Sequence, residues 1–226
     1  MRIDRPPPSA RGAPLTAEGF RRLTGVSRET LARLERYADL LTRWQARINL
    51  VGRESVRDLW RRHMLDSAQL VPLLPDGATK FIDIGSGAGF PGLILAVMGA
   101  PETHLIEADA RKCAFLGEAV RVTDTAASVR IHRGRVEDLN PWPVDVVVAR
   151  AVAPLTRLLG YAAPFLRSET VCLFPKGAGV EEELTRSRET WTMTVERFPS
   201  VSDPSGTILR LGNITRASGP EQRRSR

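Results

Sequence analysis

Cysteine and long apolar runs are both scarce in this chain of 226 residues. The two cysteines, Cys113 and Cys172, are too few for a disulfide framework and too isolated for a metal site. No apolar run approaches the length of a membrane span, and the proline- and arginine-rich start lacks the apolar segment of a secretory signal. The sequence therefore predicts a cytoplasmic protein with no membrane partner and no bound metal.

Lysine is also rare, with three residues, and arginine supplies nearly all of the positive charge. The net charge of +7 is unevenly distributed: residues 1–62 carry 14 Arg against 7 Asp and Glu, and residues 213–226 carry 4 Arg against one Glu. The segment between them is net negative. A preference for arginine over lysine explains the type of residue but not its placement, and basic ends indicate a polyanionic partner.

Composition and periodicity divide the chain into four parts. We expect a disordered N-terminus over 1–15, a helical extension over 16–76, an α/β domain over 77–213 and a basic disordered tail over 214–226. In the extension, apolar spacings of three, four and seven predict a helix from Ser27 to about Ile48. A second helix is expected from about Glu54 to Leu70. The sequence gives no basis for an oligomeric state, and a monomer is favoured.

A glycine-rich loop opens the α/β domain. The apolar run Phe81–Ile84 ends in glycine, and three more glycines follow within eight residues before the apolar segment Leu93–Met98. This order predicts a strand, a loop that a ligand can approach closely, and a helix. The loop matches the dinucleotide pattern G-x-G-x-x-G, but Asp83 would repel a pyrophosphate and would attract an ammonium group. S-adenosylmethionine carries an ammonium and a sulfonium and no phosphate, so it is the favoured ligand over a nicotinamide dinucleotide or an empty turn.

The rest of the domain alternates strands with helices, as a doubly wound parallel sheet does. Ligands of such sheets bind beyond the carboxyl ends of the strands. Five charged residues fall at those ends: Asp83, Glu107, Glu137, Arg150 and Lys176. Glu107 lies 18 residues after Gly89, where a carboxylate can accept both hydroxyls of an adenosine ribose.

These residues together resemble the RsmG (GidB) family, which methylates guanine N7 in small-subunit ribosomal RNA. The matching pieces run in order from about Trp44 to Gly177: INLVGRES, RRHMLDS, FIDIGSGAGFPG, RGRVEDL, VVARAVAPL and PKG. The resemblance implies a class I S-adenosylmethionine-dependent methyltransferase, a Rossmann-like doubly wound sheet with an N-terminal helical extension. It also implies 16S ribosomal RNA, or a small-subunit assembly particle, as the partner.

The resemblance carries cofactor contacts onto five residues of this chain, in addition to Glu107: Gly85, Phe90, Val136, Glu137 and Arg150. Phe90 stands where the family often has leucine, and Pro175 before Lys176 is a second departure. Contacts to substrate RNA are expected from Lys176, Arg57 and Arg61. His63 could contact RNA, but a structural pairing with Asp66, three residues later, is favoured.

No general base is expected, because guanine N7 carries a lone pair and no proton at neutral pH. The reaction then depends mainly on alignment of the reacting atoms. Three alternatives remain beside this hypothesis. The chain could methylate another RNA or another base position, it could be a nicotinamide oxidoreductase of the same fold class, or it could be an RNA-binding module without activity.

Overall fold

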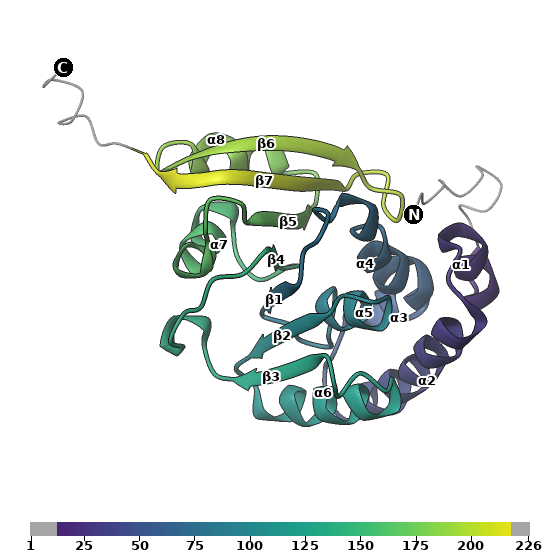
Figure 1. Ribbon diagram of the computed structural model, residues 1–226. Coiled ribbons are helices and arrows are strands. Elements are labelled where there is room, and N and C mark those ends of the chain that lie inside the picture. Colours follow the sequence, from purple (N-terminus) through teal and green to yellow (C-terminus); the bar gives the residue numbers. More distant parts are fainter. Residues whose placement is uncertain (1–12, 218–226) are drawn as a thin grey trace, which may run out of the picture.

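The computed structural model describes residues 13–217, and its centre is a seven-stranded sheet in the order β3-β2-β1-β4-β5-β7-β6 (Figure 1). The strands from β1 to β5 are parallel, and β7 runs antiparallel to both β5 and β6. The strands are β1 (Lys80–Ile84), β2 (Glu102–Glu107), β3 (Val129–Arg133), β4 (Val146–Val148), β5 (Val171–Lys176), β6 (Trp191–Pro199) and β7 (Thr207–Arg216). The strand order reverses between β1 and β4, where such sheets leave a crevice for ligands.

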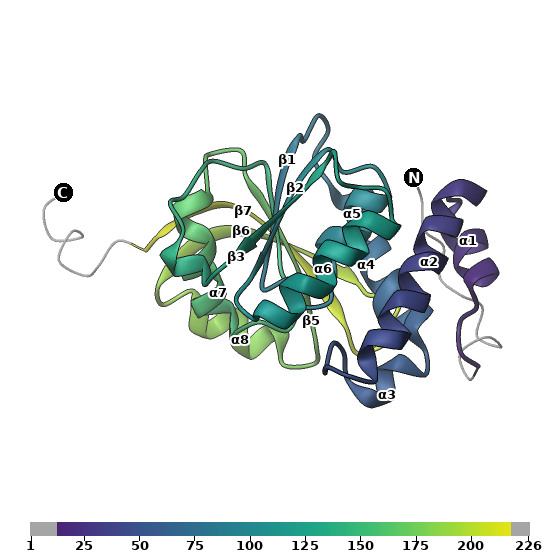
Figure 2. The ribbon, with the colours of Figure 1, turned by 90° about the horizontal axis from the view of Figure 1, so that it is seen from below.

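Helices cover both faces of the sheet (Figure 2). One face packs against α7 (Leu155–Ala162) and α8 (Val180–Ser187), and the other packs against α5 (Gly92–Val97) and α6 (Ala110–Val122). Two helices of the extension, α1 (Ala17–Thr24) and α2 (Arg28–Gln45), lie outside α5 and α6. The predicted fold class is therefore confirmed.

Local sequence signals explain several of these elements. Asp109 caps α6, since its side chain accepts from the N–H groups of Arg111 and Lys112. Ser27 caps α2 in the same way, accepting from the N–H of Thr30. All three residues of β4 are valines and all are buried, as expected for a central parallel strand covered on both faces.

The second predicted helix is wrong as a continuous element. In its place the chain forms α3 (Arg53–Val56), a turn, a π-helix η2 (Trp60–Leu65) and α4 (Asp66–Ala68), followed by the 3₁₀ turn η3 (Val71–Leu73). A π-turn is wider than an α-turn, and such turns are frequent at functional sites. Four of the six residues of η2 are buried, and η2 packs against α1 and α4.

Arginine side chains attach the extension to the α/β domain. Arg33 donates to the backbone carbonyls of Thr123 and Asp124, and Arg36 donates to that of Val122, all at the C-terminal end of α6. The last carbonyls of a helix lack intrahelical partners and attract cations. Part of the basic character of residues 1–62 therefore serves internal contacts.

The tip between β6 and β7 also contacts the extension. The side chain of Gln69 accepts from the N–H of Val201 at 2.8 Å and donates to the hydroxyl of Ser200 at 3.1 Å. Strand β7 continues to Arg216, past the domain boundary expected at residue 213. Of the expected disordered N-terminus, residues 1–12 lie outside the described part of the chain, and so does the expected tail from residue 218. Over residues 13–217, no helix is both long enough and apolar enough to cross a membrane.

Candidate active site

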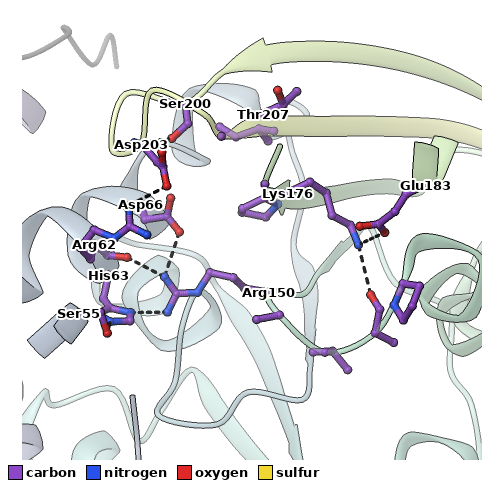
Figure 3. Close-up of a pocket in the computed structure, with 18 residues that line it drawn as sticks. Ser55, Arg62, His63, Asp66, Arg150, Lys176, Glu183, Ser200, Asp203 and Thr207 are labelled. Atoms are coloured by element: carbon purple, nitrogen blue, oxygen red, sulfur yellow. Dashed lines mark hydrogen bonds and ion pairs between the residues drawn. The ribbon is translucent and has the colours of Figure 1, made fainter. Parts of the chain in front are cut away.

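Two cavities lie at the carboxyl edge of the parallel strands, and both are lined by Val152 and Ala153. The first, called here the strand-end cavity, has a volume of about 320 Å³ and lies between the ends of β1 and β2 and the loop after β3. The second, called here the arginine cavity, has a volume of about 650 Å³ and lies between η2, the ends of β4 and β5, and the β6–β7 tip (Figure 3). The segment after β4 thus lies against two neighbouring spaces.

Gly85 begins the glycine loop and forms the floor of the strand-end cavity. Its φ of +69° lies in the left-handed region, which glycine adopts without strain. A Cβ atom added here would lie 2.7 Å from Cγ2 of Val152. A side chain at Gly85 would therefore collide first with the protein's own Val152, a neighbour that the sequence did not indicate.

Glu107 lies at the end of β2 with its carboxylate in the wall of the strand-end cavity. It is 8% exposed, and its two oxygens accept from the N–H groups of Gly87 and Asp109, each at 2.8 Å. A carboxylate oxygen can accept more than one hydrogen bond, so both keep capacity for a ligand's hydroxyl groups. The structure therefore brings together Gly85, Glu107, Val136 and Glu137, as the sequence predicted for one site.

Glu137 and Val136 belong to the short 3₁₀ turn η4 (Val136–Asp138) on the far side of the strand-end cavity. Val136 is 8% exposed, whereas the side chain of Glu137 is 39% exposed and lies 3.5 Å from Nη2 of Arg135. The pKa of Glu137 is lowered, first by a backbone hydrogen bond and then by Arg135. Glu137 is accordingly ionised at neutral pH and accessible from solvent.

Asp83 does not face either cavity. It is fully buried, and Oδ2 accepts from the N–H of Gly92 at 2.9 Å, while Oδ1 is buried without a hydrogen-bond partner among the described residues. Burial raises the pKa of Asp83 to about 7. Asp83 lines neither cavity and Gly92 packs against its carboxyl group, so the structure does not place this carboxylate in direct contact with a ligand in either cavity.

Phe90 is also placed differently from its expected role. Its side chain is 3% exposed and lines neither cavity. The ring stacks on His63 with centroids 4.8 Å apart and meets the edge of Tyr37 at 5.6 Å. Phe90 therefore packs in the core between the glycine loop and the extension, and the sequence pattern could not separate this position from one facing a ligand.

Arg150 follows β4 and lines the arginine cavity, to which the labelled side chains of Figure 3 converge. Nη1 donates to Oδ2 of Asp66 and to the backbone carbonyl of Arg62, both at 3.0 Å. Nη2 lies 2.6 Å from Nδ1 of His63. The guanidinium thus binds three groups of the extension, and the structure does not place it in the strand-end cavity with the other predicted cofactor residues.

His63 is a buried, neutral link in this network. Arginine has no acceptor atom, so Nδ1 of His63 must accept from Arg150, and Nε2 then carries the proton and donates to Oγ of Ser55 at 2.8 Å. Burial, together with the charges of Arg150 and Arg62, lowers the pKa of His63 to about 3. The predicted structural role agrees with this burial, but the partner is Arg150, because Asp66 is itself paired with Arg150.

Lys176 at the end of β5 lines the opposite wall of the arginine cavity (Figure 3). Its Nζ donates to Oε2 of Glu183 at 2.8 Å and to the carbonyl of Ala153 at 3.2 Å. Pro175 therefore does not prevent Lys176 from pointing into the site. Glu183 was missed by the sequence analysis, since the run of three acidic residues resembles an ordinary helix start.

Arg57 and Arg61 differ sharply in their surroundings. The side chain of Arg57 is 78% exposed and lies 3.3 Å from Glu54. Arg61 is 8% exposed, donating to Asp58 at 2.8 Å and to the carbonyl of Ala13 at 2.8 Å. The structure leaves Arg57 accessible to a phosphate, whereas the expectation that Arg61 contacts RNA from the surface is corrected by its burial.

Sequence comparison places these features among known proteins. A family model described as rRNA small subunit methyltransferase G matches residues 30–208. A protein named ribosomal RNA small subunit methyltransferase G from Paramagnetospirillum magneticum is 59% identical, over 85% of this chain and 93% of its own length. One of the same name from Rhodospirillum rubrum is 56% identical, over 90% of this chain and 100% of its own length.

Structural comparison supports the fold alone. A putative O-methyltransferase from Klebsiella pneumoniae superposes with a TM-score of 0.55 at 16% identity, over 80% of this chain and 90% of the other. An O-methyltransferase from Bacillus cereus, solved in complex with SAH, gives 0.55 at 15% identity, over 79% of this chain and 90% of the other. The fold of this chain thus has counterparts in solved methyltransferases.

Proposed function

This chain belongs to the rRNA small subunit methyltransferase G family, and from that premise we propose that it transfers a methyl group from S-adenosylmethionine to N7 of a guanine in 16S ribosomal RNA. The observation that carries the proposal is the pair of cavities that meet at Val152 and Ala153. One has a carboxylate suited to a ribose, and the other has a guanidinium and an ammonium suited to a base or a phosphate. The methyl donor and the guanine that accepts the methyl group can therefore bind in neighbouring cavities that share Val152 and Ala153.

The residues of the strand-end cavity fit S-adenosylmethionine. Glu107 offers two carboxylate oxygens to the ribose hydroxyls, and Ile84, Ile106 and Val136 supply apolar surface for the adenine. Bound in this cavity, the cofactor supplies an electrophilic methyl group on a positively charged sulfur. The absence of a side chain at Gly85 keeps the floor of the cavity open. A nicotinamide dinucleotide is disfavoured, because the family of this chain is one of methyltransferases.

The arginine cavity suits an acceptor that has no proton to lose. His63 has both ring nitrogens engaged and a pKa of about 3, so it is not available as a general base. Arg150 and Lys176 offer N–H groups that can hold a base by its oxygen. Guanine N7 attacks through its lone pair, so binding and alignment supply the rate enhancement. An acceptor such as N7 loses no proton, so it is compatible with a neutral His63 whose two ring nitrogens are already hydrogen-bonded.

The substrate is an RNA segment with an accessible guanine. The major groove of A-form RNA is too deep and narrow for side chains to reach the N7 edge, so the target must lie in a loop or a distorted segment. The exposed Arg57 is 78% solvent-accessible and is the phosphate contact proposed on the extension. A ribosomal substrate, as naked RNA or as an assembly particle, places the reaction in the cytoplasm.

The test is methyl incorporation from labelled S-adenosylmethionine into purified small-subunit RNA and, in parallel, into assembly particles. We expect incorporation by the wild type and by Glu189→Gln, an exposed carboxylate outside both cavities. Glu107→Ala should abolish or strongly reduce it at low cofactor concentration. Incorporation that is equal in large-subunit RNA, or that persists unchanged in Glu107→Ala, would contradict the proposal.

A further inference from the structure

The Lys176–Glu183 pair is built to leave hydrogen-bonding capacity facing the arginine cavity. Oε2 of Glu183 accepts from Nζ of Lys176 at 2.8 Å and from the N–H of Leu155 at 2.6 Å. Lys176 uses a second donor on the carbonyl of Ala153. An ammonium has three donors, so one remains, and Oε1 of Glu183 accepts from no group in the described part of the chain.

Glu183 is distinguished in this respect from the other two carboxylates that line the cavity, Asp66 and Asp203. Asp66 accepts through both oxygens, from Gln69 and Ser202 on one and from Arg150 on the other. Asp203 also accepts through both, from Ser205 on Oδ1 and from Arg62 on Oδ2. Every oxygen of those two carboxylates already accepts from a group of the protein, whereas Oε1 of Glu183 accepts from none in the described part of the chain.

The side chain of Glu183 is also held in place while remaining accessible. It is 28% exposed, and that of Lys176 is 10% exposed. The N–H of Leu155 belongs to the first turn of α7 and fixes the position of Oε2. The result is a donor and an acceptor side by side, rigidly presented at one wall of the cavity, as Figure 3 shows for Lys176 and Glu183.

We propose that Lys176 and Glu183 together read the Watson–Crick edge of the target guanine, an inference that rests on the proposed function. Along that edge guanine presents an acceptor, O6, next to two donors, N1–H and the N2 amine. Lys176 donates to O6, and the carboxylate of Glu183 accepts from N1–H and N2–H. No covalent step is involved, and the contact adds a specificity for guanine that the positive charges of Arg150 and Lys176 alone do not give.

Adenine is rejected by the same pair. It presents a donor, the N6 amine, where guanine has O6, and an acceptor, N1, where guanine has N1–H. The amine would face the ammonium of Lys176, and the N1 lone pair would face the carboxylate of Glu183. A site built to hydrogen-bond a substrate discriminates strongly against an analogue that leaves its polar groups unpaired.

The arrangement is compatible with attack by N7. In the purine ring O6 lies between N1 and N7, so contacts to O6, N1 and N2 leave the N7 lone pair unoccupied. Arg150, on the other wall, can contact the RNA backbone or O6 without blocking that atom. The Watson–Crick edge must be unpaired for this binding, which agrees with a target in a loop or a distorted segment.

The experiment compares guanosine with inosine at the target position. Inosine keeps O6, N1–H and N7 and lacks only the N2 amine, so it removes one contact to Glu183 and none to Lys176. After the methylated guanine has been mapped, synthetic RNA fragments carrying either base are assayed for kcat/KM. We expect the wild type to prefer guanosine by about tenfold or more. Glu183→Gln should lower kcat/KM for guanosine by about tenfold or more and bring the guanosine-to-inosine ratio close to one.

Two controls separate this role from a structural one. Glu182→Gln alters the neighbouring carboxylate, which is 78% exposed and pairs with Arg186 on the surface, and it should keep the wild-type ratio. Affinity for S-adenosylhomocysteine should be unchanged in Glu183→Gln, which also reports that the variant is folded. A wild type with no preference for guanosine would overturn the inference even if no variant folds, because that measurement needs no variant. An unchanged guanosine-to-inosine ratio in a folded Glu183→Gln would also overturn the inference. Neither of these two results would affect the proposed function. A wild type that methylates neither the fragments nor ribosomal RNA would overturn both the inference and the proposed function.

Discussion

Asp66 accepts a hydrogen bond from Nη1 of Arg150 at 3.0 Å, and this contact joins the helical extension to the end of β4. The other oxygen of Asp66 accepts from the amide of Gln69 at 2.9 Å and from the hydroxyl of Ser202 at 2.5 Å. One carboxylate thus links α4, the β6–β7 tip and the arginine that faces the acceptor. The orientation of Arg150 depends on two segments outside the parallel part of the sheet.

Replacing Asp66 with asparagine should therefore affect both stability and transfer. The side chains of Asp66 and Arg150 are 15% and 17% exposed, and the substitution leaves the guanidinium without its charged partner. We expect the free energy of unfolding to fall by about 1–3 kcal/mol, measured by urea denaturation. The single-turnover rate should fall further than the affinity for S-adenosylhomocysteine does. As a control, Glu54→Gln removes the surface ion pair with Arg57, in which the carboxylate is 83% exposed, and it should change neither the free energy of unfolding nor the single-turnover rate. Equal effects of Asp66→Asn and Glu54→Gln would contradict the proposed role of Asp66 in orienting Arg150.

The stability of the protein should depend on pH through two buried groups with opposite slopes. The pKa of His63 is about 3 in the folded chain and about 6.5 when unfolded, so its contribution is present above pH 6.5 and is lost as the pH falls. The pKa of Asp83 is about 7 in the folded chain and about 3.9 when unfolded, so its contribution is present at low pH and is lost as the pH rises toward 7. Between about pH 4 and 6.5 the two contributions oppose each other.

Single substitutions should separate these slopes in urea denaturation at several pH values. Relative to the wild type, His63→Gln should become more stable as the pH falls from 6.5 to 4, by at most about 1.4 kcal/mol per pH unit. Asp83→Asn should become more stable relative to the wild type as the pH rises over the same range. A difference from the wild type that does not vary with pH would show that the group keeps an ordinary pKa in the folded chain.

Substitution of Arg57 should affect RNA binding and substitution of Arg61 should affect stability, although both residues were predicted to contact RNA. Arg57→Gln should reduce the dependence of RNA affinity on salt by about one unit of slope if it contacts one phosphate. Arg61→Gln should lower the stability of the fold, because its guanidinium binds Asp58 and Ala13, and should leave the slope unaltered. The slope is measured by RNA titration over a range of salt concentrations. An effect of Arg61 on the slope with none from Arg57 would place the RNA on another face.

Cofactor affinity should depend on Glu107 and on the space above Gly85. Calorimetry with S-adenosylhomocysteine should show that Glu107→Ala binds more weakly by about 1–3 kcal/mol, the range for a lost partner of a buried polar group. Gly85→Val should abolish binding, because its side chain would collide with Val152 and would require a positive φ. Glu137→Ala, at a more exposed wall, should have a smaller effect. Wild-type affinity in both Glu107→Ala and Gly85→Val would exclude the strand-end cavity as the cofactor site.

Much of the fold could be predicted because its signals are local. The cap at Asp109 and the apolar residues after it are local signals that define α6 from Ala110 to Val122. The buried valines of β4 likewise predict a central strand. The π-helix at Trp60–Leu65 could not be predicted, since no residue pattern in this segment distinguishes it from an α-helix.

The candidate site was predictable where a residue's role follows from its strand end. Glu107, Val136 and Glu137 line one cavity because parallel strands bring their carboxyl ends to one edge. The burial of Phe90 and Arg61 and the open oxygen of Glu183 depend on contacts between segments far apart in the chain, such as Arg61 with Ala13 and Glu183 with Leu155. The spacing of residues along the sequence does not indicate such long-range contacts.

The most direct test of the proposed reaction is the identity of the methylated nucleoside. Small-subunit RNA lacking the modification is incubated with the protein and S-adenosylmethionine, digested to nucleosides, and analysed by mass spectrometry against methylguanosine standards. We expect 7-methylguanosine from one position in the RNA, and much less of it from Glu107→Ala at the same low cofactor concentration. A methyl group on the guanine N2 amine, on guanine N1 or on adenine would contradict the account, because the proposed acceptor is the N7 lone pair of a guanine.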